Sequence, residues 1–203
     1  MTKRRSRKLE AYIEGLAEAV AYFSPQNKTT RELWVIRAYL MNAGVPFRNE
    51  EVEGSKVEPP DVLFRGARFE VKEVLDPGRR RHAEFKAELE RARSATTMKG
   101  LLSMFTPVDV TLEDIYSRCL TEVRKLSKKY PSSVRSSLDL IFYVNLQHVM
   151  EVSEEPFPDT SELSSHRWRS VSFVKGNRAC CLYARHDAPP YIAVMVGKVC
   201  HRV

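Results

Sequence analysis

Two acidic residues and a lysine stand close together in the segment from Pro60 to Lys72. Two neighbouring carboxylates can hold a hard divalent cation, and oxygen ligands favour Mg²⁺, with Mn²⁺ as a substitute. A bound cation can polarise a phosphoryl oxygen and activate water, while a nearby ammonium stabilises the charge that develops. The chemistry available to Asp61, Glu70 and Lys72 is therefore that of a metal-dependent phosphodiesterase.

The same segment predicts a β-hairpin that would bring these side chains together. If Gly66-Ala67 forms a two-residue type II′ turn, Asp61 lies opposite Lys72 and Leu63 lies opposite Glu70. Side chains alternate between the two faces of a strand, so Asp61, Glu70 and Lys72 are expected to share one face. The backbones of Asp61 and Glu70 would be about 7–8 Å apart. The other face is expected to be apolar and to consist of Val62, Phe64, Phe69, Val71 and Val74. An alternative is that Lys72 forms only a modest surface ion pair with Asp61.

Apolar periodicity and turn residues predict the elements that position this hairpin. Helices are expected over 9–23, from Thr29 to Gly44, over 82–93 and from Thr111 to Pro131. Strands are expected over 47–57, 62–64, 69–74, 140–144, 171–174, 179–184 and 191–199, and a loop over 151–165. The continuous apolar run from Leu140 to Val144 predicts a central strand that is covered on both faces.

This order predicts an α/β fold: a helix, a three-stranded meander, a helix and a strand, with a mixed sheet flanked by helices. The 203 residues are expected to form a single domain. Residues 1–28 would be a basic arm and a first helix, 29–150 the core, and 165–203 a small C-terminal β region with a hairpin and a strand.

The motifs resemble those of the PD-(D/E)XK nuclease superfamily, which includes restriction endonucleases and Holliday-junction resolvases. Pro60-Asp61 is similar to its first motif and Glu70-Val71-Lys72 to its Glu-x-Lys motif. The resemblance implies a restriction-endonuclease-like core, a catalytic trio of Asp61, Glu70 and Lys72, and metal ligation by Asp61 and Glu70. It also implies an auxiliary catalytic glutamate on the first core helix, here Glu32, and it favours a homodimer. The whole chain also resembles a bacterial family described as endonucleases.

Glu32 has an alternative role, because Thr29-x-x-Glu32 is the spacing of a helix capping box. Trp168, between two arginines, could stack on a base or belong to the core. The histidines at 148, 166, 186 and 201 show no ligand spacing and are expected to be structural or exposed.

A formal net charge of +7 and a pI of about 9.3 favour a polyanionic partner. Arginines beside the motif are candidate contacts to nucleic acid, expected to be DNA: Arg65, Arg68, Arg79, Arg80 and Arg81. The last three could instead be only the charged start of a helix. The basic tail over residues 3–8 could be an arm that adds non-specific affinity, or a solubilising end.

The four cysteines lack zinc-site spacing and disulfide-scaffold density, which predicts reduced thiols in the cytoplasm. The apolar stretches are shorter than the roughly 20 residues of a membrane span, and the N-terminus does not continue as a secretion signal. The sequence thus predicts a Mg²⁺-dependent DNA endonuclease. The alternatives are a catalytically silent nuclease-fold module that binds nucleic acid or a protein, and a metabolite-handling protein, for which no Gly-rich phosphate loop is present.

Overall fold

The structure is a computed structural model that describes residues 6–101 and 104–202 of the 203-residue chain. These residues form two compact units, the first from residues 6–31 with the described part of 77–106, the second from 32–76 with 107–202. The expected single domain over 1–203 stays a prediction. Residues 3–5 of the expected basic arm lie outside the described residues, whereas Arg7 and Lys8 already belong to a helix.

The first unit is built around two helices, α1 (Arg7–Tyr22) and α3 (Arg81–Ser94), close to the expected positions. Their apolar stripes meet in a small core of Leu9, Leu16, Leu89, Ala92 and Leu101. The Ser6 side chain accepts a hydrogen bond from the Leu9 backbone N–H and so caps α1. The ring of Phe23, just after α1, stacks on Phe85 of α3 at 5.2 Å between centroids.

A short 3₁₀ turn, η1 (Pro25–Asn27), leads directly into α2 (Lys28–Asn42). Thr29 is therefore the second residue of α2 and does not precede it. The expected capping box of Thr29 and Glu32 is wrong, because a capping residue must lie outside the helix that it caps.

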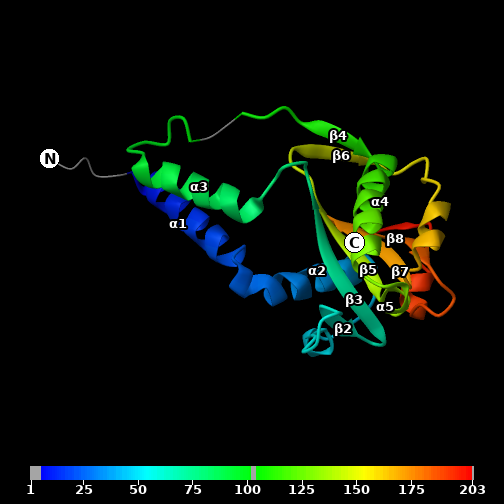
Figure 1. Ribbon diagram of the computed structural model, residues 1–203. Coiled ribbons are helices and arrows are strands. Elements are labelled where there is room, and N and C mark those ends of the chain that lie inside the picture. The colour runs from blue at the N-terminus through cyan, green and yellow to red at the C-terminus, as the bar shows by residue number, and fades with distance from the viewer. Residues whose placement is uncertain (1–5, 102–103, 203) are drawn as a thin grey trace. The chain divides into compact units, whose positions relative to one another are not determined.

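The second unit contains a seven-stranded mixed sheet within the described residues (Figure 1). Its order is β1 (Glu53–Gly54), β2 (Val62–Phe64), β3 (Ala67–Leu75), β5 (Asp139–Asn145), β7 (Ser170–Lys175), β8 (Arg178–Ala184) and β9 (Val199–His201). Strands β3, β5 and β7 are parallel, and the other neighbours are antiparallel. The predicted meander corresponds to β1, β2 and β3, and β5 is the central strand, as its apolar run predicted. The strand expected over 47–57 is wrong for most of its length, because that segment contains the 3₁₀ turn η2 (Asn49–Glu51) and only the two residues of β1.

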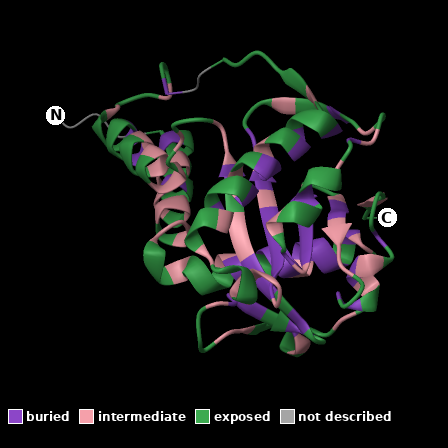
Figure 2. Ribbon diagram, turned by 45° about the vertical axis from the view of Figure 1, so that its right-hand side comes forward, coloured by how far each residue is buried: buried purple, intermediate pink, exposed green. Residues whose placement is uncertain are grey.

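Two cores lie on opposite faces of this sheet. Side chains of β5 alternate between them: Leu140, Phe142 and Val144 pack on α4 (Leu112–Lys129), while Ile141 lies on the side of α2. Figure 2 shows the resulting band of buried residues along the central strands. The described residues therefore form a mixed α/β fold whose central sheet is flanked by helices.

Helix α4 begins directly after Thr111, which caps it as the sequence predicted. The Thr111 N–H donates to Asp114 Oδ2 at 2.8 Å, and the Asp114 N–H donates to Thr111 Oγ1 at 3.0 Å, which is a capping box. The helix ends before Pro131 and is followed by the short α5 (Ser132–Arg135).

The sequence-based expectations fail mainly in the connections. Strands β4 (Val108–Thr111) and β6 (Val149–Ser153) form a separate parallel pair, and the expected loop over 151–165 contains the end of β6 and η3 (Ser161–His166). The strand expected over 191–199 is replaced by α6 (Pro190–Ala193) and the start of β9. The C-terminal strands are part of the main sheet and not a separate β region, because β7 pairs with β5. Within the described chain, no helix is both long and apolar enough to cross a membrane.

Candidate active site

The hairpin that carries the motif turns one residue earlier than expected. Arg65 and Gly66 have φ angles of 40° and 80°, so they are the two central residues of a turn with positive φ at both positions, as in type I′. Leu63 therefore pairs with Arg68, and Val62 with Phe69. The expected register was wrong by two residues, and because side chains alternate with a period of two, the assignment of β2 side chains to faces is unchanged.

One residue was assigned to the wrong face. Val74 follows Lys72 by two residues on β3 and therefore shares the face of Glu70 and Lys72. It belongs to the core beneath α4, whereas Val62, Phe64 and Phe69 belong to the opposite core. The candidate site thus occupies the polar part of this face of β3, at Glu70 and Lys72, and the same face becomes apolar at Val74.

The structure brings Asp61, Glu70 and Lys72 together. Lys72 Nζ lies 2.5 Å from Glu70 Oε1 and 3.6 Å from Asp61 Oδ2. The Val71 backbone N–H donates to Asp61 Oδ2 at 2.9 Å. Asp61 and Glu70 are only 6% and 3% exposed, so the ion pairs that Lys72 makes with them are more than modest contacts at the surface. Two carboxylates share one ammonium, which leaves the trio with a net negative charge that a cation would neutralise.

Tyr130 is a fourth member that sequence reasoning missed. It directly follows α4, and its hydroxyl donates to Glu70 Oε1 at 2.6 Å. Burial, together with this hydrogen bond and the charge of Glu70, raises the pKa of Tyr130, which keeps the phenol protonated as a donor. Sixty residues separate Tyr130 from Glu70, and no local motif links them.

The donor set suits Mg²⁺, which proteins commonly bind through one or two carboxylates, with water and substrate phosphate completing the octahedron. Asp61 and Glu70 supply two such oxygen donors. Glu32 is buried on α2, but the described residues contain no group of three or more His, Cys, Asp and Glu that could hold a metal. Glu32 therefore does not join Asp61 and Glu70 in one such group, and a role for it stays a prediction.

The two arginines of the hairpin have different surroundings. Arg65 binds Glu51 through Nε at 3.2 Å and a terminal nitrogen at 3.0 Å, and its guanidinium lies 4.8 Å from the centroid of the Phe64 ring. The Arg68 backbone N–H donates to Asp139 Oδ2 at 2.9 Å, while its side chain is exposed. Both arginines line a depression of about 400 Å³ on the hairpin.

The other three candidate arginines belong to the first unit. Arg79 Nε donates to Glu84 Oε2 at 2.9 Å, Arg80 precedes α3 and is exposed, and the Arg81 guanidinium lies 3.8 Å from the centroid of the Phe23 ring. Arg79 and Arg81 thus already have partners, Glu84 of α3 and the Phe23 ring after α1. Contact of these arginines with nucleic acid stays a prediction.

A second buried acid, Asp139, organises the start of the parallel strands. It is fully buried and accepts hydrogen bonds from Arg169, the Ser170 hydroxyl and the Arg68 backbone N–H. Arg169 also donates to the Gly66 carbonyl at 3.0 Å. This network joins β3, β5 and β7 beside the hairpin, and its acceptors are already occupied, which indicates a structural role.

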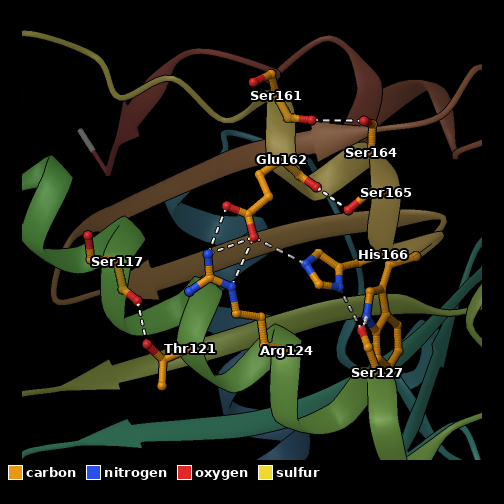
Figure 3. Close-up of polar contacts among 10 residues, drawn as sticks. Ser117, Thr121, Arg124, Ser127, Ser161, Glu162, Ser164, Ser165 and His166 are labelled. Atoms are coloured by element: carbon orange, nitrogen blue, oxygen red, sulfur yellow. Dashed lines mark hydrogen bonds and ion pairs between the residues drawn. The ribbon is translucent and has the colours of Figure 1, made fainter.

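A further polar cluster lies between η3 and α4 (Figure 3). His166 Nδ1 lies 3.2 Å from Ser127 Oγ, and its Nε2 lies 3.6 Å from Glu162 Oε1. The order of serine, histidine and glutamate could suggest a nucleophile, but Glu162 also binds Arg124 through two hydrogen bonds. These contacts attach η3 to α4, as expected for a structural histidine. Trp168 is fully buried and packs against Tyr130, so it belongs to the core.

A family model described as "Putative endonuclease, protein of unknown function (DUF1780)" matches residues 6–203. The chain belongs to this family. No curated protein matches the chain.

A solved structure of a Pseudomonas aeruginosa PAO1 protein is similar to this family member over 96% of the present chain and 93% of the other, with 27% identity and a TM-score of 0.68. That protein is described as a member of the monooxygenase superfamily. The family description and the name of this structural neighbour thus differ in the activity that they suggest. Membership of the PD-(D/E)XK superfamily stays a prediction.

Proposed function

We propose that the chain is a metal-dependent endonuclease that hydrolyses phosphodiester bonds of DNA at Asp61, Glu70 and Lys72. The observation that carries the proposal is the placement of one ammonium on two buried carboxylates, at 2.5 and 3.6 Å, at the open end of the β2–β3 hairpin. The family description as an endonuclease supports it. The order of a helix, a meander, a helix and a strand supports a restriction-endonuclease-like relationship.

Each side chain has a role in this proposal. Asp61 and Glu70 would hold Mg²⁺, or Mn²⁺ as a substitute, which supplies an electrophile for the phosphoryl oxygen when bound. Lys72 would orient the attacking water and stabilise the developing negative charge through its ammonium. Tyr130 holds Glu70 Oε1 by its hydroxyl and so limits rotation of that carboxylate. The proposed enzyme acts in the cytoplasm, where its cysteines stay reduced, and as a homodimer.

The main alternative is a silent module of the same fold that binds nucleic acid or a protein without cutting. A monooxygenase is a further alternative, which rests on the description of the Pseudomonas protein. The paired carboxylates and the lysine favour hydrolysis, since this set provides oxygen ligands and an ammonium for a phosphate.

The deciding experiment is cleavage of linear, nicked, single-stranded and branched DNA with Mg²⁺ or Mn²⁺. We expect Asp61→Asn and Lys72→Ala to lower the cleavage rate at least about 100-fold, the order of loss of a group that stabilises transition-state charge. Lys198→Ala, which removes an exposed lysine outside the helices and strands, is the matched control and should cut like the native protein. Circular dichroism would establish that each variant is folded.

The outcomes separate the alternatives. Cleavage by Lys72→Ala at the native rate would overturn the assignment of the site. If neither the native protein nor any variant cuts DNA but all retain it in a gel, the silent module is favoured. If the native protein does not cut DNA but consumes O₂ in the presence of NADH, an oxygenase is favoured.

A further inference from the structure

Three side chains form a row across the first three strands of the sheet. Glu53 on β1 pairs with Leu63 on β2, and Leu63 pairs with Arg68 on β3. Directly paired residues share a face, so a carboxylate, an apolar side chain and a guanidinium project side by side. All three line the depression of about 400 Å³, together with Glu51, Phe64 and Arg65 to Ala67.

This row adjoins the candidate active site on the same face of the hairpin. Leu63 follows Asp61 by two residues, and Arg68 precedes Glu70 by two residues. Two residues along a strand span about 6.4–6.8 Å. A molecule in the depression can therefore be covalently continuous with a phosphate held at Asp61 and Glu70.

The row offers three kinds of contact. Leu63 is 37% exposed, which leaves an apolar surface open to solvent. The exposed side chains of Glu53 and Arg68 make no hydrogen bond or ion pair with other residues of the described chain. The carboxylate can accept hydrogen bonds, and the guanidinium can donate them or stack on a ring.

The wall beside the row is preformed. Glu51 accepts hydrogen bonds from Arg65 and from the Arg48 backbone N–H, and these bonds lower the pKa of Glu51, the Arg48 bond contributing most. Arg65 has a φ angle of 40°, which is unfavourable for a residue other than glycine. Such local strain persists only when surrounding contacts maintain it, and it is frequent at ligand sites. Here the contacts to Glu51 and to the Phe64 ring maintain it.

We propose that Glu53, Leu63 and Arg68 bind an unpaired nucleobase beside the scissile phosphodiester, so that the substrate is single-stranded or frayed DNA. This inference rests on the proposed function and specifies its substrate. A depression that held only phosphate would gain nothing from the Glu53 carboxylate, which repels it. A base within a duplex has its faces stacked and its pairing edge occupied, and so cannot use the row.

The carboxylate also predicts a preference among bases. Cytosine carries an exocyclic amino group that donates to a carboxylate, whereas thymine carries a carbonyl at the corresponding position. Single-stranded DNA rich in cytosine is therefore expected to bind more tightly than oligothymidine.

Fluorescence anisotropy with labelled oligodeoxycytidine, oligothymidine and a DNA duplex, each of about 12 residues, tests this inference on the full chain in EDTA, where no metal-dependent cleavage occurs. We expect Arg68→Ala to weaken single-strand binding about tenfold, and duplex binding less, because a charged hydrogen bond to a ligand has roughly that effect. Glu53→Ala should abolish the preference for cytosine over thymine. Arg202→Ala and Glu151→Ala are the controls, because they remove exposed charges of the same types elsewhere on the chain. They should leave unchanged both the ratio of single-strand to duplex affinity and the ratio of oligodeoxycytidine to oligothymidine affinity.

Leu63→Ala provides a charge-neutral check, because it shortens an exposed side chain and should weaken single-strand binding alone. Equal affinity of the native protein for single strand and duplex, or equal effects of Arg68→Ala and Arg202→Ala, would overturn the inference. Cleavage of duplex DNA that Lys72→Ala abolishes would then leave the proposed function standing. Failure of the native protein to bind any of the three DNAs would overturn the inference, and the cleavage assay with Mg²⁺ or Mn²⁺ would decide the proposed function separately.

Discussion

At the scale of single residues, Glu70 is the most constrained group of the candidate site. Its Oε1 accepts from both Lys72 Nζ and the Tyr130 hydroxyl, at 2.5 and 2.6 Å. Two donors on one oxygen fix the rotation of the carboxylate and direct its other oxygen away from them. Tyr130 is thus placed as a positioning residue that acts through Glu70.

Replacement of Tyr130 by phenylalanine tests that role. We expect Tyr130→Phe to lower kcat up to about tenfold, because a net hydrogen bond of about 1 kcal/mol is lost from the carboxylate. Mn²⁺ affinity, measured by calorimetry, should fall in parallel, which a purely structural role would not cause. Tyr12→Phe is the matched control, since Tyr12 donates to Glu88 at 3.0 Å in the first unit. An unchanged Mn²⁺ affinity in Tyr130→Phe would contradict the positioning role.

Asp139 leads to a prediction about stability. Asp139→Ala would leave the partly buried Arg169 guanidinium without its carboxylate partner. Loss of one partner of a buried ion pair costs about 3–5 kcal/mol of unfolding free energy. Urea denaturation would measure this loss, and Asp159→Asn, at an exposed acid in a loop, should cost far less. Similar midpoints for the two variants would show that the network contributes little.

The residues that could be predicted are those within one hairpin. Asp61, Glu70 and Lys72 lie within 12 positions of one another, so alternation along the strands was sufficient to place them on one face. Tyr130 and Asp139 could not be predicted, because their contacts with the hairpin depend on how α4 and β5 pack against β3. The pairing of Arg65 with Glu51 was also missed, because the two residues lie 14 positions apart and meet only when β1 pairs with β2.

At the scale of elements, the start of α4 gives a prediction with a pH dependence. The Thr111 backbone N–H and hydroxyl donate to Asp114 and lower the pKa of its carboxyl, the backbone bond contributing most. A pKa below the unfolded value, about 3.9, stabilises the fold above that pH, and this stabilisation disappears as the pH falls through the folded pKa.

We therefore expect Asp114→Asn to lower the melting temperature at pH 7 and to have a diminishing effect as the solution is acidified below about pH 3.9. Thr111→Ala should cost about 1 kcal/mol, the usual value of an N-cap residue. Thermal melts followed by circular dichroism would measure both effects. Asp109→Asn, at an exposed acid of β4, is the control; a difference that does not shrink in acid would contradict the capping role.

Helices and central strands were predictable from the sequence because their patterns are local. The stripe of α4 and the apolar run of β5 determined both elements. The hairpin turn was misplaced because Arg-Gly is an unusual pair for positions that both require positive φ, and Gly66 alone suggested the other turn type. Strands β4 and β6 pair with each other across distant sequence, and neither carries a strong alternating pattern.

At the scale of the whole molecule, the net charge of +7 predicts how binding depends on salt. Each phosphate that a cationic side chain neutralises on single-stranded DNA changes the slope of log affinity against log salt by about −0.7. We expect the slope of the native protein to correspond to several such contacts. Arg68→Ala should reduce the magnitude of this slope by at most about 0.7, the value of one contact. Anisotropy titrations over a range of salt concentrations would measure the slope. An affinity independent of salt would contradict a polyanionic partner.

The fold class could be predicted from the order of the elements, whereas the extent of the sheet could not. The C-terminal hairpin was recognised, but its pairing with β5 depends on contacts between residues such as Asp139 and Ser170, far apart in sequence. The division of the described chain into two units was also not apparent, because the first unit combines two segments that are distant along the chain.

The two outermost strands of the main sheet are short: β1 has two residues and β9 has three. A long open edge offers unpaired N–H and C=O groups on which the sheet of another molecule can continue, and short edges reduce this risk of aggregation. The outermost strands β1 and β9 therefore offer a second copy only two and three residues of backbone. A dimer that continued the sheet would have to use the part of β3 beyond Phe69, which pairs with β5 on one side and with no strand of the described chain on the other.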